Sequence, residues 1–357
     1  MLRDAQDYGS LNVHMRAQRT ELFTAGTYNL LASATDFANL HQMLAQTRYG
    51  DIIGAEMVKE YPNLVEIDRR LTQNFVDQYN LYRKFIPKRA KGFVDAYSYS
   101  HFLNNIKVIL SALHGASLNE DARGMLINLT DEENMQIEDL FRSRDAEELI
   151  TRLENEDLKN ALDAVLGEYK YLDLVYPLII AVDQYFFSTL CKEMNKLKGA
   201  DKESTKGFFS AKIGIQNLEI ILRSKTFDVS PTIVKNWIMQ TKFCPLRTEF
   251  RDKLIATQNL EEAFTYIRDE TTFKELANRL IENLEAERPP LENFDRYADQ
   301  FMVHKANSLF QGASFNIGIL PAFFYLKELE IRNLRTIILG KIHKRSINDI
   351  LDKIVLV

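Results

Sequence analysis

The sequence predicts an all-α protein built from three similar helical repeats. Apolar residues recur at the helical spacing of about 3.6 residues along most of the chain, and no alternating apolar–polar run is long enough to indicate a sheet. Its 14 glycines and 8 prolines are few for 357 residues, which disfavours an all-β chain with many turns. The repeats are indicated by a short motif, Asn followed by an aliphatic residue and a charged residue, with Ile four positions after the Asn. This motif occurs at Asn105, Asn217 and Asn333.

Two further marks keep the same register as the repeated asparagine. An aspartate precedes the first asparagine by 37 residues and the other two by 34; these aspartates are Asp68, Asp183 and Asp299. A helix-capping residue precedes the asparagines by 69, 72 and 74 residues, at Asp36, Asp145 and Asn259. Three ordered marks at nearly constant offsets indicate internal repetition. We therefore expect repeat domains at residues 1–118, 119–228 and 229–357, because glycine, aspartate, serine and proline cluster near 115–131 and 226–231.

Each repeat is expected to contain the same succession of helices. The first repeat opens with an amphipathic segment that places Tyr8, Leu11, Met15 and Leu22 near one face. A capped helix follows in every repeat, beginning after Asp36, Asp145 or Asn259. Long helices are then expected around 64–85, 174–197 and 293–311, followed by glycine-containing loops at 87–92, 198–207 and 312–321. The last helix of each repeat carries the repeated asparagine.

The chain shows the features of a cytoplasmic protein. Cys191 and Cys244 are the only cysteines and share no metal-ligand spacing, which indicates unpaired thiols in a reducing compartment. Residues 1–7 are polar and lack the apolar core of a signal peptide. Residues 306–326 carry no charge and could in length span a bilayer, but polar side chains, two glycines and Pro321 interrupt them. We interpret this stretch as a helix end followed by an apolar loop.

No motif for catalysis, a cofactor or a metal is present in the sequence. There is no glycine-rich phosphate loop, no Gly-x-Ser-x-Gly and no His-Glu-x-x-His, and none of the six histidines has Glu three positions before it. Carboxylate catalysis needs two acids in one pocket, whereas Asp68, Asp183 and Asp299 each occur once per repeat. A repeated structural role is favoured for these aspartates and for the three asparagines. An enzyme that brings Asp68 and Asp183 together remains the less favoured alternative.

Charge is distributed unevenly. The net charge of −5 disfavours a nucleic-acid-binding function. Basic residues gather at positions 83–91 and 341–345, where they form solvated loops or contact an acidic partner or anionic lipid headgroups. Acidic residues crowd the middle third, at Glu132, Glu133, Glu138, Asp139, Asp145, Glu147, Glu148, Glu154, Glu156 and Asp157.

Both ends of the chain resemble a known family. The run from Tyr325 to Lys341, YLKELEIRNLRTIILGK, is similar to the closing signature of the C-type subunits of archaeal and bacterial A/V-type ATPases. Their counterpart in the eukaryotic vacuolar enzyme is the d-type subunit. The amino-terminal stretch also matches, from Tyr8 through Arg16, Arg19, Leu30-Leu31 and Asp36-Phe37 to Thr47-Arg48-Tyr49-Gly50. The resemblance covers essentially the whole chain, although the middle third matches only loosely.

The resemblance implies a mechanical, non-catalytic part of a rotary motor. Family members form a funnel of three helical domains around a pseudo-threefold axis, seated on the ring of membrane proteolipids and receiving the central stalk, with its D- and F-type subunits. The chain would then be present once in a hetero-oligomeric complex at the membrane surface. It would transmit torque between ATP hydrolysis or synthesis and H⁺ or Na⁺ transport, with no cofactor, nucleic acid or small-molecule substrate. A helical scaffold outside any rotary motor is the alternative.

Docking residues are expected in the loops before the asparagine-bearing helices. These loops occupy equivalent places in the three repeats and would gather at one end of a pseudo-threefold body. The candidates are Lys88, Arg89 and Lys91 in the first repeat, Lys198, Lys202 and Lys206 in the second, and the apolar stretch Phe315 to Phe323 in the third.

Overall fold

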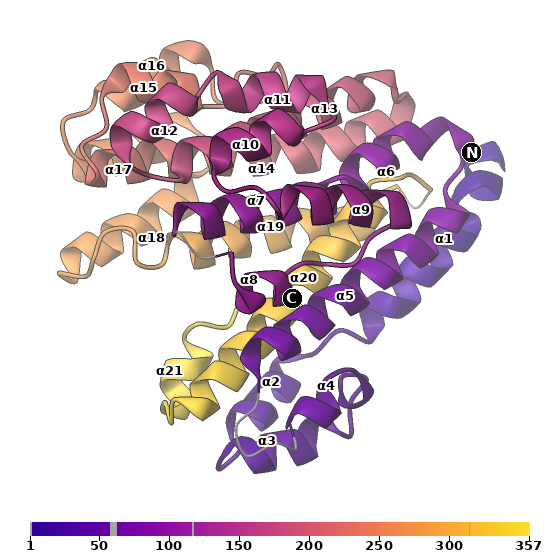
Figure 1. Ribbon diagram of the computed structural model, residues 1–357. Coiled ribbons are helices and arrows are strands. Elements are labelled where there is room, and N and C mark those ends of the chain that lie inside the picture. The colour runs from indigo at the N-terminus through magenta and orange to yellow at the C-terminus, as the bar shows by residue number, and fades with distance from the viewer. Residues whose placement is uncertain (1, 58–62, 116–117, 314) are drawn as a thin grey trace. The chain divides into compact units, whose positions relative to one another are not determined.

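The computed structural model describes residues 2–57, 63–115, 118–313 and 315–357, and every regular element within these ranges is a helix (Figure 1). The predicted all-α class is therefore confirmed. The chain divides into two compact units. We call residues 194–325 the internal unit, and residues 2–193 together with 326–357 the terminal unit. The threefold funnel and the repeat-domain boundaries remain predictions.

The terminal unit contains the helices from both ends of the chain. Two long helices, α13 (Tyr176–Lys196) and α20 (Ile319–Ile342), lie mostly in this unit and continue into the internal one. The other elements are α1 (Leu2–Thr20), α2 (Ala25–Ala32), α3 (Phe37–Leu44), α4 (Gly50–Met57), α5 (Leu64–Tyr82), η1 (Arg83–Phe85), η2 (Lys88–Ala90), α6 (Lys91–Ser98), α7 (Ser100–His114), α8 (Glu120–Gly124), α9 (Asp131–Leu140), α10 (Ala146–Arg152), α11 (Glu156–Asp163), α12 (Leu166–Leu172) and α21 (Ile347–Leu351).

The internal unit is organised on one very long helix, α14 (Gly199–Thr226), against which α19 packs. Apolar residues lie along α14 before and after the repeated asparagine Asn217. Of these, Phe209, Ile213 and Leu218 are fully buried. The remaining elements are α15 (Pro231–Trp237), α16 (Thr248–Ala256), α17 (Leu260–Glu270), α18 (Lys274–Glu285) and α19 (Phe294–Gln311).

The predicted helix starts agree with the structure. Asp36, Asp145 and Asn259 are N-caps of α3, α10 and α17, and each side-chain oxygen accepts the backbone N–H three residues later, at 2.8, 2.8 and 2.9 Å. Such a bond satisfies one of the N–H groups that the first helical turn leaves unpaired. The three predicted long helices are also confirmed, as α5, α13 and α19.

Burial follows the predicted helical faces. Tyr8, Leu11 and Met15 of α1 are completely buried, as the amphipathic spacing predicted. On α5 the buried residues are Ile67, Leu71, Phe75, Val76, Tyr79 and Tyr82, which recur at intervals of three and four. Burial of these faces supplies most of the stabilisation of each helix, since isolated helices of this length are marginal in water.

Two predicted loops are wrong. In the expected loop 87–92, residues 88–90 form η2 and α6 begins at Lys91. Residues 198–207 were expected to form a glycine-containing loop, but α14 already begins at Gly199. Gly199 adopts a positive φ of 54°, which lets the chain turn within two residues of the end of α13. The Lys202 ammonium also donates to the backbone oxygen of Asn195, at 3.4 Å, across this turn. A long loop is therefore unnecessary here.

The uncharged stretch 306–326 is interrupted as predicted. Helix α19 ends at Gln311 and α20 begins at Ile319, so the stretch does not form one continuous helix. Asp201 of α14 holds the connection by accepting the N–H of Ile317 at 2.9 Å. Within the described residues, no helix has the length and apolar character that crossing a membrane requires.

Candidate functional site

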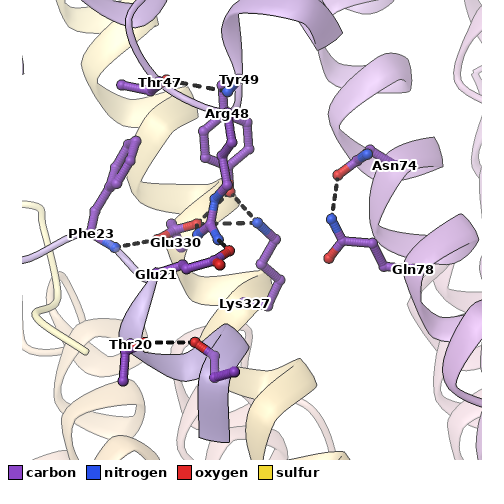
Figure 2. Close-up of polar contacts among 11 residues, drawn as sticks. Thr20, Glu21, Phe23, Thr47, Arg48, Tyr49, Asn74, Gln78, Lys327 and Glu330 are labelled. Carbon is purple, nitrogen blue, oxygen red and sulfur yellow. Dashed lines mark hydrogen bonds and ion pairs between the residues drawn. The ribbon is translucent and has the colours of Figure 1, made fainter. Parts of the chain in front are cut away.

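A buried ionic cluster joins the two stretches that carry the family resemblance (Figure 2). Its centre is the carboxylate of Glu330 on α20, which is completely buried. This carboxylate accepts hydrogen bonds from the Arg48 guanidinium, the Tyr49 hydroxyl and, at 2.5 Å, the backbone N–H of Phe23. Lys327, one helical turn before Glu330, lies 3.3 Å from the same carboxylate and donates to the Tyr49 hydroxyl at 2.7 Å.

Local backbone geometry explains why Arg48 and Tyr49 point at this carboxylate. The hydroxyl of Thr47 bonds to the Leu44 carbonyl at 2.7 Å and accepts the Tyr49 N–H at 3.2 Å, which forms a tight turn after α3. Gly50 follows, and a Cβ atom at this position would lie 2.8 Å from the Cα of Ala45. The sequence Thr47-Arg48-Tyr49-Gly50 is thus a turn that only glycine can close. It presents two donors to α20.

The charges of the cluster compensate one another. Burial lowers the pKa of Lys327 to about 8, although the negative charge of Glu330 opposes this effect. Burial also acts to lower the pKa of Arg48, but the attraction of Glu330 outweighs it and the net shift is upward. For Tyr49, burial and the Glu330 charge together raise the pKa well above its ordinary value. The cluster therefore holds a carboxylate, two cations and a neutral phenol.

The arrangement acts as a clamp. Glu330 connects α20 to the α1–α2 turn through Phe23 and to the α3–α4 turn through Arg48 and Tyr49. Arg48 reaches further, to Glu21, whose carboxylate lies 3.6 Å away. Because one buried carboxylate accepts from Phe23, Arg48 and Tyr49, its evident role is to fix three chain segments together.

Reasoning from the sequence missed this cluster, although its signal was present. Lys327 and Glu330 lie three residues apart on one face of α20, and each follows a buried leucine, Leu326 or Leu329. Charged residues are almost never fully buried unless they are paired. The spacing allowed an ion pair, and the structure shows that this pair is buried. The partners Arg48 and Tyr49 are about 280 residues away in sequence and could not be assigned from periodicity.

The repeated asparagines form the same structure three times. Each side-chain amide makes two hydrogen bonds to the backbone of the residue 22 positions later: Asn105 to Ile127, Asn217 to Met239 and Asn333 to Val355. The six donor–acceptor distances range from 2.7 to 3.2 Å, and all three asparagines are buried. The predicted structural role of these residues is confirmed, since each asparagine fastens the segment that follows its helix.

The repeated aspartates have different partners. Asp68 is ion-paired with Arg335, and Asp183 is ion-paired with Lys107. Asp299 accepts a hydrogen bond from the Tyr325 hydroxyl at 2.6 Å. These contacts fix one helix against another, as the structural interpretation predicted. No group of three or more acidic, histidine or cysteine side chains suited to a metal occurs in the described parts of the chain.

The predicted docking residues differ in their surroundings. Lys88, Lys91, Lys198 and Lys206 are exposed, and Lys202 is half-buried. Arg89 is bound to α1 through Asp4 and Asp7, at 2.8 and 2.9 Å, and its guanidinium lies over the Tyr8 ring.

The apolar end of the predicted docking set is mostly inside the protein. Phe315 is 37% exposed, but Phe323 is completely buried and packs edge-to-face against Phe324. Phe323 therefore belongs to the core and offers no surface in this structure. The reason is that residues from Ile319 onward form helix α20, and not the loop that the sequence suggested.

The family match and the similar proteins of known name all indicate the same kind of subunit. The chain matches the family described as "ATP synthase (C/AC39) subunit" over residues 11–352. It is 23% identical to the C subunit of the A-type ATP synthase of Methanocaldococcus jannaschii, over 96% of this chain and 84% of the relative. It is 23% identical to the C subunit of Haloferax volcanii, over 92% of this chain and 91% of the relative. The Pyrococcus abyssi protein of the same name is 22% identical, over 92% and 85%.

Proposed function

Because the chain belongs to the ATP synthase (C/AC39) subunit family, whose members are structural and non-catalytic components of a rotary ATPase, we propose that it seats the central stalk on the membrane proteolipid ring. In this role it passes torque between the ATP-driven head and the ion-carrying ring. The observation that carries the proposal is the family match over residues 11–352. It includes the carboxyl-terminal motif and all of the amino-terminal motif except Tyr8.

The contacts of the terminal unit support a torque-transmitting role. A part that transmits torque must resist local unfolding, because a segment that opens under load dissipates the applied work. Glu330 fixes the amino-terminal turns to α20, and Arg335, on the same helix, is ion-paired with Asp68 of α5. Asn333 fastens the carboxyl-terminal segment to α20 as well. Helix α20 therefore binds several distant segments of the chain into one stiff body.

The proposal is tested by purifying the assembly that contains the tagged chain from its native host. Central-stalk subunits of the D and F type and the proteolipid are expected to co-purify in fixed ratio with it. In membranes from a strain that lacks the chain, ATP hydrolysis should persist in a detached head while ATP-driven ion pumping is lost. Recovery with unrelated partners, together with normal pumping in the deletion strain, would support the scaffold alternative and contradict the rotor proposal.

We also propose that the exposed basic residues and Phe315 belong to docking surfaces of this adaptor. Lys88 and Lys91 lie in the terminal unit, and Lys198, Lys206 and Phe315 lie in the internal unit. A single exposed charge contributes about 1 kcal/mol or less, so charges must be changed together. Lys88→Glu combined with Lys91→Glu is expected to weaken holoenzyme assembly at low salt. Arg89 is left unchanged because its replacement would also break the contacts with Asp4 and Asp7.

A matched control separates docking from net charge. Lys242→Glu combined with Lys274→Glu makes the same change in charge at two exposed lysines of the internal unit. Assembly should survive this control. If the Lys88–Lys91 variant assembles as well as the control at both low and high salt, the first-repeat surface is not an interface.

A further inference from the structure

A hollow beside the acid-rich middle third contains none of the residues that the adaptor proposal uses. It has a volume of about 270 Å³ and lies where α7, α9, α10 and the start of α11 meet within the terminal unit. Helices α7, α9 and α10 are drawn side by side in Figure 1 and contact one another. The lining residues that matter here are Tyr99, Phe102, Glu132, Met135, Asp139 and Glu154. We call this feature the acidic hollow.

The inner wall of the acidic hollow is aromatic. The rings of Tyr99 and Phe102 are stacked, with centroids 5.1 Å apart and planes inclined by 18°. Phe102 is buried, whereas Tyr99 is only partly covered. Met135, which is 75% exposed, lies at the same hollow and adds a flexible, polarisable side chain. The electron-rich face of an aromatic ring attracts cations, and thioether groups adapt to varied partners.

The rim of the acidic hollow carries an excess of negative charge. Glu132, Asp139 and Glu154 line it, and Arg152 is the only basic residue among the described lining residues. Arg152 is held by Asp139 and by Glu148, each at 2.8 Å, so its charge is already matched within the protein. Burial raises the pKa of the Tyr99 hydroxyl, and the neighbouring Tyr185, Glu133 and Glu154 add to this effect.

We propose that the acidic hollow receives the side chain of an arginine or lysine from a basic segment of a partner protein. Carboxylates at the rim would pair with the cationic head, and the Tyr99 face would contact its flat or methylene surface. A volume of about 270 Å³ admits one or two long side chains but no folded element. The charge and the shape of the hollow therefore complement the same type of residue.

Other occupants fit less well. An anion would meet the rim carboxylates Glu132 and Glu154, while Arg152 is already paired, so a phosphorylated or acidic segment is repelled. A choline lipid headgroup carries a suitable cation, but its phosphate would lie next to the same carboxylates. A purely apolar side chain would leave Glu132 and Glu154 without any compensating charge.

The binding test uses the full-length chain and a dye-labelled hexa-arginine peptide as the probe. Binding is measured by fluorescence anisotropy, and the methyl resonance of Met135 is followed by NMR to locate the peptide. Glu132→Gln combined with Glu154→Gln is expected to weaken binding about tenfold, and Tyr99→Leu about threefold. The Met135 methyl resonance should shift on peptide addition in the natural protein and stay unchanged in the Glu132–Glu154 variant.

The control is a second charge-neutralising pair in the same acid-rich region. Glu156→Gln with Asp157→Asn removes the same charge from two exposed residues of α11 that do not line the hollow. This control should bind the peptide within about twofold of the natural protein. Equal weakening by both pairs would show general attraction to an acidic surface and overturn the proposal. An unmoved Met135 resonance, or stronger binding to phosphatidylcholine vesicles than to the peptide, would overturn it as well. None of these results depends on the adaptor function.

Discussion

Arg335 on α20 is ion-paired with Asp68 on α5, 267 residues earlier in the chain. The same relationship recurs between Lys107 and Asp183, and both cations stand two positions after a repeated asparagine. In each case the helix that carries the asparagine is bound to a helix that carries the repeated aspartate of another predicted repeat. These two ion pairs therefore join helices that belong to different predicted repeats.

The remaining asparagine-bearing helix, α14 with Asn217, forms its inter-helix ion pair through a different residue. Two positions after Asn217 stands Glu219, which cannot pair with an aspartate. Arg223, one turn further along α14, bonds to Glu219 at 2.8 Å and reaches Asp295 of α19 at 3.3 Å. An ion pair thus also joins α14 to α19, but its cation, Arg223, stands four residues after the position that Lys107 and Arg335 occupy in the other two helices. Asp295 is 68% exposed, so this pair is more strongly screened by solvent than the other two.

The Lys107–Asp183 pair is expected to be energetically coupled. Their side chains are only 24% and 18% exposed, so water and salt screen the attraction weakly. A double-mutant cycle with Lys107→Met and Asp183→Asn, followed by urea unfolding, should give a coupling energy of about 1–2 kcal/mol. The Lys235–Asp252 pair, 51% and 49% exposed, is the control and should give less than about 0.5 kcal/mol. Equal coupling in the two cycles would show that Lys107 and Asp183 form an ordinary surface pair.

Replacement of Asn105 by leucine should destabilise the terminal unit. The leucine side chain leaves the N–H and the carbonyl of Ile127 buried without their partner, at a cost of about 2–4 kcal/mol in the free energy of unfolding. The neighbouring Asn104→Leu on the same helix is the control, because Asn104 is exposed. It should change stability by less than about 0.5 kcal/mol. Chemical denaturation of both variants compares them, and similar losses would mean that the 22-residue amide bridge contributes little.

Neutralising Glu330 should be far more costly than neutralising its neighbour Glu328. Glu330→Gln leaves Arg48 and Lys327 without their shared anion in a buried place, which we expect to lower the free energy of unfolding by about 3–5 kcal/mol. Glu328→Gln removes the same charge from an exposed position on α20 and should cost less than about 1 kcal/mol. Thermal and urea unfolding of the two variants distinguish them. A Glu330→Gln protein as stable as the Glu328→Gln protein would refute the clamp.

His101 should make the protein sensitive to mild acid. Burial between Phe75 and Tyr79 lowers the pKa of its imidazole from 6.5 to about 4. Because the unfolded chain binds a proton near pH 6.5 and the folded protein only near pH 4, stability falls as the pH decreases through this window. Between pH 7 and pH 5 we expect a loss of about 2 kcal/mol that is absent in His101→Phe. Urea unfolding of both proteins at the two pH values measures it, and parallel losses would exclude His101 as the cause.

The sequence alone determined the class of the fold and its repeated marks. Helical periodicity, together with capping residues such as Asp145 and Asn259, located the helix starts correctly because a cap is a local interaction between residues three apart. The repeated asparagines were recognised from the short motif around them and its nearly constant offsets to upstream residues. The structure adds what the sequence did not show, that each asparagine bonds to the backbone of the residue 22 positions later.

Only the tertiary structure decided which distant residues meet. Glu330 is bound to Arg48 and Tyr49, and Arg335 to Asp68, across more than 260 residues of chain. Phe323 and Phe315 belong to the same apolar run. Only the structure shows that Phe323 lies in the core while Phe315 remains partly exposed. Periodicity reports which face of a helix is apolar, but many partners could cover that face. The choice among them depends on long-range packing and on matching buried charges, which no local pattern encodes.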